Sequence, residues 1–354
     1  MTPRGTDCGL ALLVALGLVS GLATWFAGSP GGAWVFGGHA LAGTALALVL
    51  VFKLRRVLPH VVGARARRDR RTLRGLLALA LVLSVLVTGI VWSSAGKAGV
   101  AGFTVLVWHG ALGAVLAVVV LAHARVRAKR PRGRDLADRR QFLTAAALAA
   151  ATVAVWQAQR PVQRALGLPG ARRRFTGSYD AGSFTGNAFP ETSWVADRPR
   201  PLAGNGYRLT VAGRVRRPLA LTAAELDVGD ALTATLDCTG GFFSTQRWRG
   251  VSLGRLLDAA GVEPGARHVR VISRTGYRWS FSLADARGLL LATHVGDEPL
   301  AHGHGAPCRL VAPGRRGFQW VKWVERVEVH EDPDPGAVAS TLWSSFTAAG
   351  RGAA

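Results

Sequence analysis

The chain has few cysteines, and their spacing fits neither a disulfide framework nor a tetrahedral metal site. Only Cys8, Cys238 and Cys308 occur among its 354 residues. Disulfide-stapled domains use an even, closely spaced set, and zinc sites use pairs separated by a few residues. We therefore expect no structural disulfide. Each thiol is then either a buried core residue or a ligand.

Acidic residues are also scarce, 21 against 44 lysines and arginines, which gives a net charge of +23. Such a balance is a common footprint of nucleic-acid binding. Here, however, 49% of the residues are hydrophobic, and the basic clusters lie in short loops between apolar runs. We interpret the charge as a membrane-topology signal and expect no nucleic-acid partner.

Long apolar runs fill the first 160 residues. They approach or reach the length of about 20 residues that spans a bilayer. Their bounds are 9–27, 38–54, 74–93, 103–123 and 141–157. Residues 1–160 are therefore expected to form an all-α transmembrane bundle of about five helices, surrounded by membrane lipid.

The basic residues alternate by side of these runs. They crowd into residues 53–75 and 123–140, whereas the loops after the first and third runs contain only Lys97. The positive-inside rule then places the amino terminus and both basic loops in the cytoplasm. Five crossings of the cytoplasmic membrane leave the carboxyl-terminal half on the outer side.

The fifth run begins with Arg139 and Arg140, followed by Phe142, Leu143 and an Ala-rich stretch. This order resembles a twin-arginine export signal, which is read by a translocase that carries folded proteins. The alternative is that two arginines only cap a membrane anchor. Export in the folded state would allow the outer domain to cross with a cofactor already bound.

Two histidines lie at matching positions of the second and fourth runs. His39 and His109 are each followed four residues later by a glycine, Gly43 or Gly113. An imidazole in an apolar span is costly without a partner, so such residues are candidate functional sites. Two facing imidazoles can ligate one b-type haem iron. The alternative is that both bind water or lipid head groups.

The second half has a different pattern. Residues 161–205 are rich in Gly, Pro, Ser and Asn and are expected to form a linker and an ordered loop. Short β-like runs follow, with one clear helix between an N-cap at Ser252 and a stop at Gly261. The prediction is an α+β domain over 206–332, with 187–205 contributing, and a tail over 333–354.

Five separated motifs in this half keep a familiar order. They are LDCTGG, WRGVSLGRLL, GYRWSFSLADA, GDEPLAHGHGAPCRLVAPG and GFQWVKWVERVEV. Together they resemble the molybdopterin-binding domain of the sulfite oxidase family over about residues 187–330. The resemblance implies a molybdenum–molybdopterin oxidoreductase that moves an oxygen atom to or from a small molecule.

The resemblance also implies roles for single residues. Cys238 matches the cysteine whose thiolate binds molybdenum, a soft ligand for a soft metal, and Tyr277 matches a tyrosine beside that metal. Arg315 and Arg316 are weaker candidates for binding the phosphate group of the molybdopterin. The residues expected to hold the molybdopterin are Asn187, Phe189, Ser273, His304, Arg309, Trp320, Val321 and Lys322. The alternative for the cysteine is a core thiol, and for the bases a solvated surface.

The sequence departs from the family directly after the cysteine. Sulfite oxidation uses arginines there, whereas this chain has Thr-Gly-Gly-Phe-Phe and no arginine before Arg247, which becomes a catalytic candidate. A less polar substrate is favoured. In the related bacterial sulfoxide-reductase system a separate b-haem membrane protein supplies electrons. We expect exchange with quinone or another redox protein; the alternatives are an anchored enzyme without haem and a non-catalytic binding module.

Overall fold

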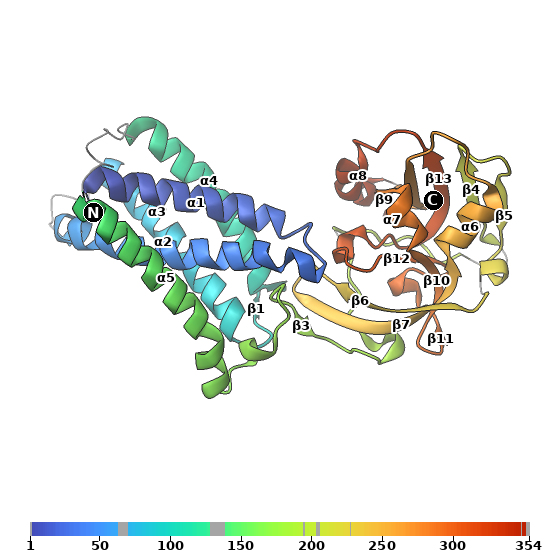
Figure 1. Ribbon diagram of the computed structural model, residues 1–354, viewed down its shortest axis with the longest axis horizontal. Coiled ribbons are helices and arrows are strands. Elements are labelled where there is room, and N and C mark those ends of the chain that lie inside the picture. Colours follow the sequence, from blue (N-terminus) through green and yellow to red (C-terminus); the bar gives the residue numbers. More distant parts are fainter. Residues whose placement is uncertain are drawn as a thin grey trace. The chain divides into compact units, whose positions relative to one another are not determined.

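The computed structural model describes residues 2–62, 70–127, 139–193, 195–202, 206–226, 228–347 and 349–351. The chain divides into two compact units, Met1–Tyr179 and Asp180–Ala354. The first is built mainly from long helices and the second around two larger β-sheets (Figure 1). A helical amino-terminal region followed by a mixed α and β domain is the fold class that the sequence predicts.

The first unit contains five long helices and one short hairpin. The helices are α1 (Pro3–Ala23), α2 (Ala33–Val62), α3 (Arg70–Ser94), α4 (Val105–Arg127) and α5 (Arg139–Ala165), and the hairpin pairs β1 (Gly99–Val100) with β2 (Phe103–Thr104). The start of α1 follows the capping rules, because the Thr2 hydroxyl accepts the Gly5 N–H at 3.1 Å and Pro3 needs no donor there. Helices α1 and α2 pack together, as do α3 and α4.

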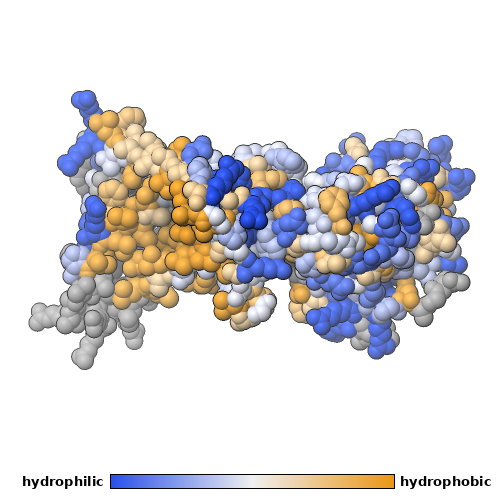
Figure 2. Space-filling model, turned by 90° about the horizontal axis from the view of Figure 1, so that it is seen from below, coloured by the Kyte–Doolittle hydropathy of each residue, from blue (hydrophilic) through white to orange (hydrophobic). Residues whose placement is uncertain are grey.

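Four helical stretches are long and apolar enough to cross a membrane: Pro3–Ala23, Pro30–Pro59, Gly75–Ser94 and Arg139–Ala165. Helix α4 has a shorter apolar stretch, Val105–Val120. Large apolar side chains gather on the surface of this unit, drawn in orange in Figure 2. A water-facing surface rarely carries so continuous an apolar area, whereas lipid accepts it. Residues 63–69 and 128–138 of the two basic loops lie outside the described residues.

The first unit continues past the end of α5. Arg173 donates hydrogen bonds to the carbonyls of Ala95 and Gly96 at 3.0 Å, and its guanidinium lies 4.1 Å from the Trp92 ring centroid. At Gly170, a Cβ atom would come within 2.1 Å of the Ser93 carbonyl oxygen, so only glycine fits. Much of the predicted linker is thus fastened to the end of α3.

The second unit contains two larger sheets. In the six-stranded sheet, β3 (Tyr179–Asp180), β7 (Phe242–Ser252), β10 (Leu290–Val295) and β11 (Glu298–Pro299) are neighbours in the order β11-β10-β7-β3, while β6 (Asp230–Asp237) pairs with β7 and β12 (Arg309–Val311) pairs with β10. The five-stranded sheet has the order β5-β4-β13-β8-β9, formed by β4 (Leu209–Gly213), β5 (Leu219–Leu221), β8 (His268–Ser273), β9 (Arg278–Ser282) and β13 (Val324–His330). Strand β4 pairs with β13 in parallel, whereas the neighbours β6 and β7, and β8 and β9, are antiparallel.

Three short helices complete this unit. Helix α6 (Leu253–Ala260) begins after Ser252 and ends at Gly261, whose φ of 67° is left-handed, as the sequence predicts. The other two are α7 (Leu283–Arg287) and α8 (Ala337–Trp343). Helix α8 packs against β9. It lies within residues 333–354, where the sequence analysis expects a tail.

Candidate active site

Cys238 lies in the tight turn between β6 and β7. Its N–H donates to the Phe242 carbonyl at 2.8 Å, and Gly241 takes a φ of 99° that glycine alone adopts without strain. The Gly240 N–H points at the Cys238 Sγ at 3.3 Å, and the Thr192 hydroxyl lies 3.8 Å from it. Burial raises the pKa of the thiol, and those two hydrogen bonds oppose the rise.

A buried ion pair lies directly beside this turn. Arg316 donates to the Asp237 carboxylate at 2.6 Å and to the Cys238 carbonyl at 3.3 Å, and its side chain and that of Asp237 are 4% and 2% exposed. Arg316 therefore fastens the backbone of the cysteine turn and does not point toward a phosphate. Arg315 forms an exposed ion pair with Asp285 instead. The expectation that these two arginines reach the phosphate is not met by their side-chain positions.

His304 is buried and fixed on both sides. Its ring stacks on Phe189, with centroids 3.8 Å apart, and its Nε2 lies 3.0 Å from the Asn187 carbonyl oxygen. Burial, followed by the charges of Arg309 and Lys322, lowers the pKa of His304 to about 4. The imidazole is therefore neutral at physiological pH, and the carbonyl acceptor requires its proton on Nε2.

Asn187 contacts His304 through its backbone carbonyl, while its side chain bonds to other residues. The amide nitrogen donates to Glu298 and to the Pro299 carbonyl, both at 2.9 Å, and the amide oxygen accepts the Ala301 N–H at 2.8 Å. These bonds use both N–H donors of the amide and one acceptor site of its oxygen, and the contact of Asn187 with a molybdopterin stays a prediction.

Arg309 is the most deeply placed cation of the site. Its side chain lies between Trp248 and Trp320, with the guanidinium carbon 5.1 Å and 5.7 Å from their ring centroids. Among the described residues, its Nε and Nη1 atoms have no hydrogen-bond partner. Burial lowers the pKa of Arg309 to about 9. A buried guanidinium with unused donors calls for an anion with several acceptor oxygens.

Lys322 adds a second cation close by. Its Nζ donates to the carbonyls of Thr192 and Gly303, both at 2.5 Å. Burial and the Arg309 charge lower the pKa of Lys322 to about 7, while the negative charges of Glu191, Cys238 and Asp197 act in the opposite direction. The neighbouring Val321 is buried, and its carbonyl accepts the Leu310 N–H at 2.8 Å.

These contacts test whether a molybdopterin fits. The group carries a phosphate and two dithiolene sulfurs, so it requires concentrated positive charge and an additional soft ligand. Arg309 and Lys322 supply the charge, and Cys238 supplies the thiolate, with hydrogen bonds already directed at its sulfur. Arg309 and Lys322 repel each other, which contributes to the lowered pKa of Lys322. An anionic cofactor bound between them would offset this repulsion, so these residues suit the cofactor.

Ser273 belongs to a buried hydroxyl cluster around Asp197. The Asp197 carboxylate accepts hydrogen bonds from Thr275 at 2.9 Å, from Ser344 at 3.0 Å and from Ser345, and Thr275 also donates to Ser273 at 3.2 Å. No local sequence pattern indicates this cluster, because Asp197 and the two serines are far apart in the chain.

The Tyr277 hydroxyl donates to the Phe318 carbonyl. Burial, then the charges of Asp197 and Cys238, raise the pKa of Tyr277 above its ordinary value. The tyrosine therefore stays protonated, and it lies close enough to Cys238 to respond to the charge on its sulfur.

Arg247 does not join this group. It is exposed on β7, whereas Gln246 and Trp248, its neighbours on the strand, are fully buried. Successive strand residues point to opposite faces, so Arg247 lies on the face away from Trp248 and Arg309. Its assignment as a catalytic residue therefore has no support from its position.

The two predicted haem ligands meet within the first unit. The rings of His39, on α2, and His109, on α4, have centroids 5.9 Å apart and stand at 89° to each other. Two imidazoles on one metal ion stand roughly 6 Å apart, because each metal–nitrogen bond is about 2 Å and the ring radii add the rest. The structure therefore brings the two histidines together, and their ligation of an iron stays a prediction.

Comparison with known proteins identifies the class of the second unit. Residues 197–338 match the family described as the oxidoreductase molybdopterin binding domain. Sulfite oxidase from Gallus gallus is 31% identical over 178 residues, 40% of this chain and 39% of the relative. The catalytic subunit of protein-methionine-sulfoxide reductase, MsrP, from Gluconobacter oxydans is 28% identical over 172 residues, 42% and 54% of the two chains.

A nitrate reductase from Hordeum vulgare is 30% identical over 159 residues, 35% of this chain and 18% of the relative. The chain thus spans between about a fifth and about half of the length of these relatives. Over residues 197–338 the second unit is similar to the oxidoreductase molybdopterin binding domain, as the five motifs imply. The helices α1 to α5 lie outside the matched residues.

Proposed function

We propose that this protein is a membrane-anchored molybdenum-cofactor oxidoreductase that transfers an oxygen atom to or from a small molecule outside the cytoplasmic membrane. The observation that carries the proposal is the position of Cys238 beside the buried cations Arg309 and Lys322. These three residues combine a thiol with two buried positive charges, and Arg309 has donor atoms that no described residue uses. The domain class independently favours the same cofactor.

The bound cofactor supplies transfer of one oxygen atom coupled to two electrons. Cys238 binds the metal as a thiolate, which Gly240 N–H and the Thr192 hydroxyl stabilise. Arg309 and Lys322 bind the anionic groups of the cofactor. Phe189 would hold the neutral imidazole of His304 in place by stacking when the cofactor is bound.

We infer that the substrate is neutral. Phe242 and Phe243 follow the cysteine turn, and the nearest arginine, Arg316, is already neutralised by Asp237. Arg274 pairs with Glu325 at 3.6 Å. An anion such as sulfite or nitrate would therefore find little free positive charge, whereas an organic sulfoxide needs none. Reducing a sulfoxide takes two electrons and two protons and yields the sulfide and water.

A substrate panel tests this function. Methionine sulfoxide, dimethyl sulfoxide, sulfite and nitrate are each assayed with an artificial electron carrier, and molybdenum is measured in the same preparation. We expect about one molybdenum per chain and turnover of a sulfoxide, abolished in Cys238→Ser and retained in Cys8→Ser. Turnover of sulfite or nitrate alone would contradict the neutral substrate. Absence of molybdenum from a preparation made in a competent host would favour the binding-module alternative.

We further propose that electrons pass between quinone, or another redox protein, and the molybdenum through one b-type haem ligated by His39 and His109. The supporting observation is their ring separation of 5.9 Å. Beside Gly43 and Gly113, one turn along from each histidine, an added Cβ would meet nothing within 4 Å. A reduced-minus-oxidised spectrum tests the haem, and its absence would leave the helices as an anchor.

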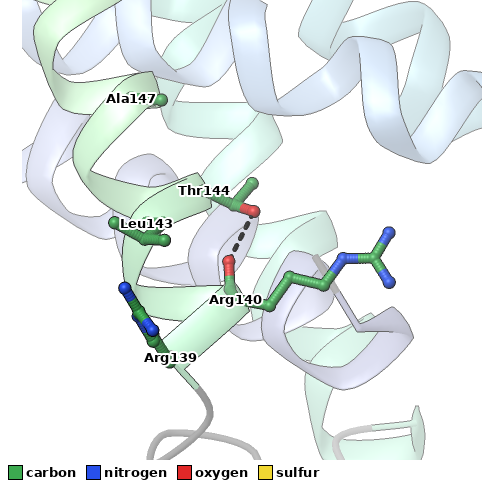
Figure 3. A pocket seen from close by; sticks show the side chains of 5 residues that line it. All are labelled: Arg139, Arg140, Leu143, Thr144 and Ala147. Carbon is green, nitrogen blue, oxygen red and sulfur yellow. Dashed lines mark hydrogen bonds between the residues drawn. The ribbon is translucent and has the colours of Figure 1, made fainter.

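Export as a folded domain is the last part of the proposal. Arg139 and Arg140 open α5, and their side chains leave the helix in different directions, while the Thr144 hydroxyl donates to the Arg140 carbonyl at 2.8 Å (Figure 3). The double substitution Arg139→Lys with Arg140→Lys keeps the charge but removes the guanidinium pair. We expect the double variant to lose export if the pair is a translocase signal and to keep it if the pair only caps an anchor.

A further inference from the structure

His39 and His109 occupy matching places in two similar helical hairpins. Helix α1 carries Leu-Val-Ser-Gly at residues 18–21, and α3 carries Leu-Val-Thr-Gly at residues 86–89. Each segment lies against the histidine of the following long helix, α2 or α4. The similarity between the α1–α2 hairpin and the α3–α4 hairpin therefore includes the histidines and the helix segments that contact them.

A hydroxyl group lies behind each imidazole. Ser20 Oγ is 3.0 Å from His39 Nδ1, and Thr88 Oγ1 is 3.3 Å from His109 Nδ1. Each hydroxyl donates its own hydrogen to the carbonyl four residues earlier in its helix. The hydroxyl oxygen is then left to accept, so in both halves the imidazole Nδ1 is the donor.

A backbone carbonyl is a second acceptor for the imidazole Nδ1–H. His109 Nδ1 lies 3.0 Å from the Val85 carbonyl oxygen. Gly17 comes three residues before Ser20, as Val85 comes three residues before Thr88, so α1 carries a backbone carbonyl at the corresponding position. A carbonyl can only accept, which fixes the proton on Nδ1 and leaves the Nε2 lone pair available. Among the described residues, neither Nε2 atom has a hydrogen-bond partner. Both histidines are thus prepared as Nε2 ligands.

The glycine that follows each hydroxyl residue gives the imidazole its room. A Cβ atom on Gly21 would come within 3.2 Å of His39 Cε1, and one on Gly89 within 3.1 Å of His109 Cε1. A larger side chain would push the ring away from its carbonyl and hydroxyl partners. Each hairpin therefore supplies three elements: an acceptor carbonyl, an acceptor hydroxyl and a glycine.

We propose that Ser20 and Thr88 are positioning residues for one haem, which is held in a cradle built twice from the same three elements. The inference rests on the proposed haem and adds which groups orient its two axial ligands. A hydrogen bond from Nδ1–H makes the imidazole a stronger donor to the metal and holds its ring in place. A stronger donor favours oxidised iron, so these bonds lower the midpoint potential of the haem.

The test measures haem content, the α-band and the midpoint potential of the full-length protein in detergent. Ser20→Ala and Thr88→Ala are expected to shift the potential upward and to weaken haem retention by about 10-fold or more. The matched control is Thr152→Ala on α5, whose hydroxyl also bonds the carbonyl four residues earlier but contacts neither histidine. Gly21→Val and Gly89→Val should lose the haem, whereas Gly75→Ala, with open space around it, should keep it.

Molybdenum content serves as the folding control, because the second unit carries that site. The wild type could contain haem while Ser20→Ala and Thr88→Ala leave its midpoint potential and retention unchanged. This result would overturn the cradle but not the proposed haem. No haem in a wild-type protein that contains molybdenum would overturn the haem proposal itself, and the cradle with it. A shift in Thr152→Ala as large as in Ser20→Ala would also overturn the specific role of the hydroxyl.

Discussion

Three buried cationic side chains of the second unit differ in the groups that offset the cost of burying their charge. Arg316 has its counter-charge, Asp237, at 2.6 Å. Arg309 has aromatic rings around it and unused donors. Lys322 donates to two carbonyls, and the charges of Glu191 and Asp197 act on it without an ion pair among the described residues. The first arrangement is structural, whereas the other two leave positive charge for a ligand, because a buried charge without a counter-ion is costly.

Breaking the Asp237–Arg316 pair should destabilise the protein strongly. Arg316→Met leaves a buried carboxylate without its counter-charge, which costs roughly 3–5 kcal/mol. Arg315→Met, its neighbour, removes an exposed pair and should cost about 1 kcal/mol or less. Denaturant unfolding followed by fluorescence measures both. Equal losses for the two variants would show that the buried pair has no special role.

Lys322 should make the stability of the cofactor-free protein depend on pH. Its folded pKa of about 7 lies below the value of about 10.4 for a free lysine, so the unfolded chain binds more protons between these values. The free energy of unfolding that comes from this group therefore rises as the pH increases from about 7 to about 10.

Melting temperatures of the cofactor-free wild type and of Lys322→Met at pH 7 and pH 9 measure this dependence. We expect the difference between the two proteins to change by several degrees in favour of the wild type at the higher pH. Titration of other groups is common to both and cancels. A pH-independent difference would mean that Lys322 is charged in the folded protein without strain.

At the scale of elements, β7 connects most of the site. Its first residues close the cysteine turn, and Trp248 further along contacts Phe189, Trp320 and Arg309. The sequence motif WRGVSLGRLL identifies this region. Helix α6 ends at the left-handed Gly261, as capping preferences predict, whereas the Ser252 side chain at its start makes no capping hydrogen bond. Strand β10 is harder to predict from the sequence, because its residues LLATHV are buried on both faces and show no alternation of apolar and polar side chains.

The alternation of β7 makes a prediction about Arg247. Arg247→Ala removes an exposed side chain on the face opposite Trp248, so kcat/KM for the oxygen-atom-transfer reaction should change by less than about 2-fold. Trp248→Ala, by contrast, should lower molybdenum content, because it opens a cavity beside Arg309. Steady-state kinetics and metal analysis compare them. A large loss of kcat/KM in Arg247→Ala would restore that residue as a catalytic candidate.

At the scale of the whole molecule, two units with opposite surfaces share one chain. The first exposes apolar side chains along several helices, and the second has a conventional buried core between its two sheets and helices. This division, together with the basic loops, leads us to expect the second unit outside the cytoplasm.

Reporter fusions test this orientation. A reporter active only outside the cytoplasm should be active when fused after residue 351 and inactive when fused in the basic loop near residue 66. A reporter active only inside should give the reverse pattern. Activity on the same side for both fusions would mean an even number of crossings between them and would overturn the five-span topology.

The sequence by itself determined the division into an apolar helical half and a mixed α and β half, because hydrophobic run length and periodicity are local properties. It also indicated the class that the second unit resembles, because the motifs around Cys238, His304 and Lys322 are contiguous in sequence and occur in a fixed order. The tertiary structure decided which side chains are free to act. Only the folded chain pairs Arg316 with Asp237, turns Arg247 to the exposed face and gathers Asp197 with Ser344 and Ser345. These outcomes depend on contacts between residues far apart in sequence, and such contacts leave no local pattern to read.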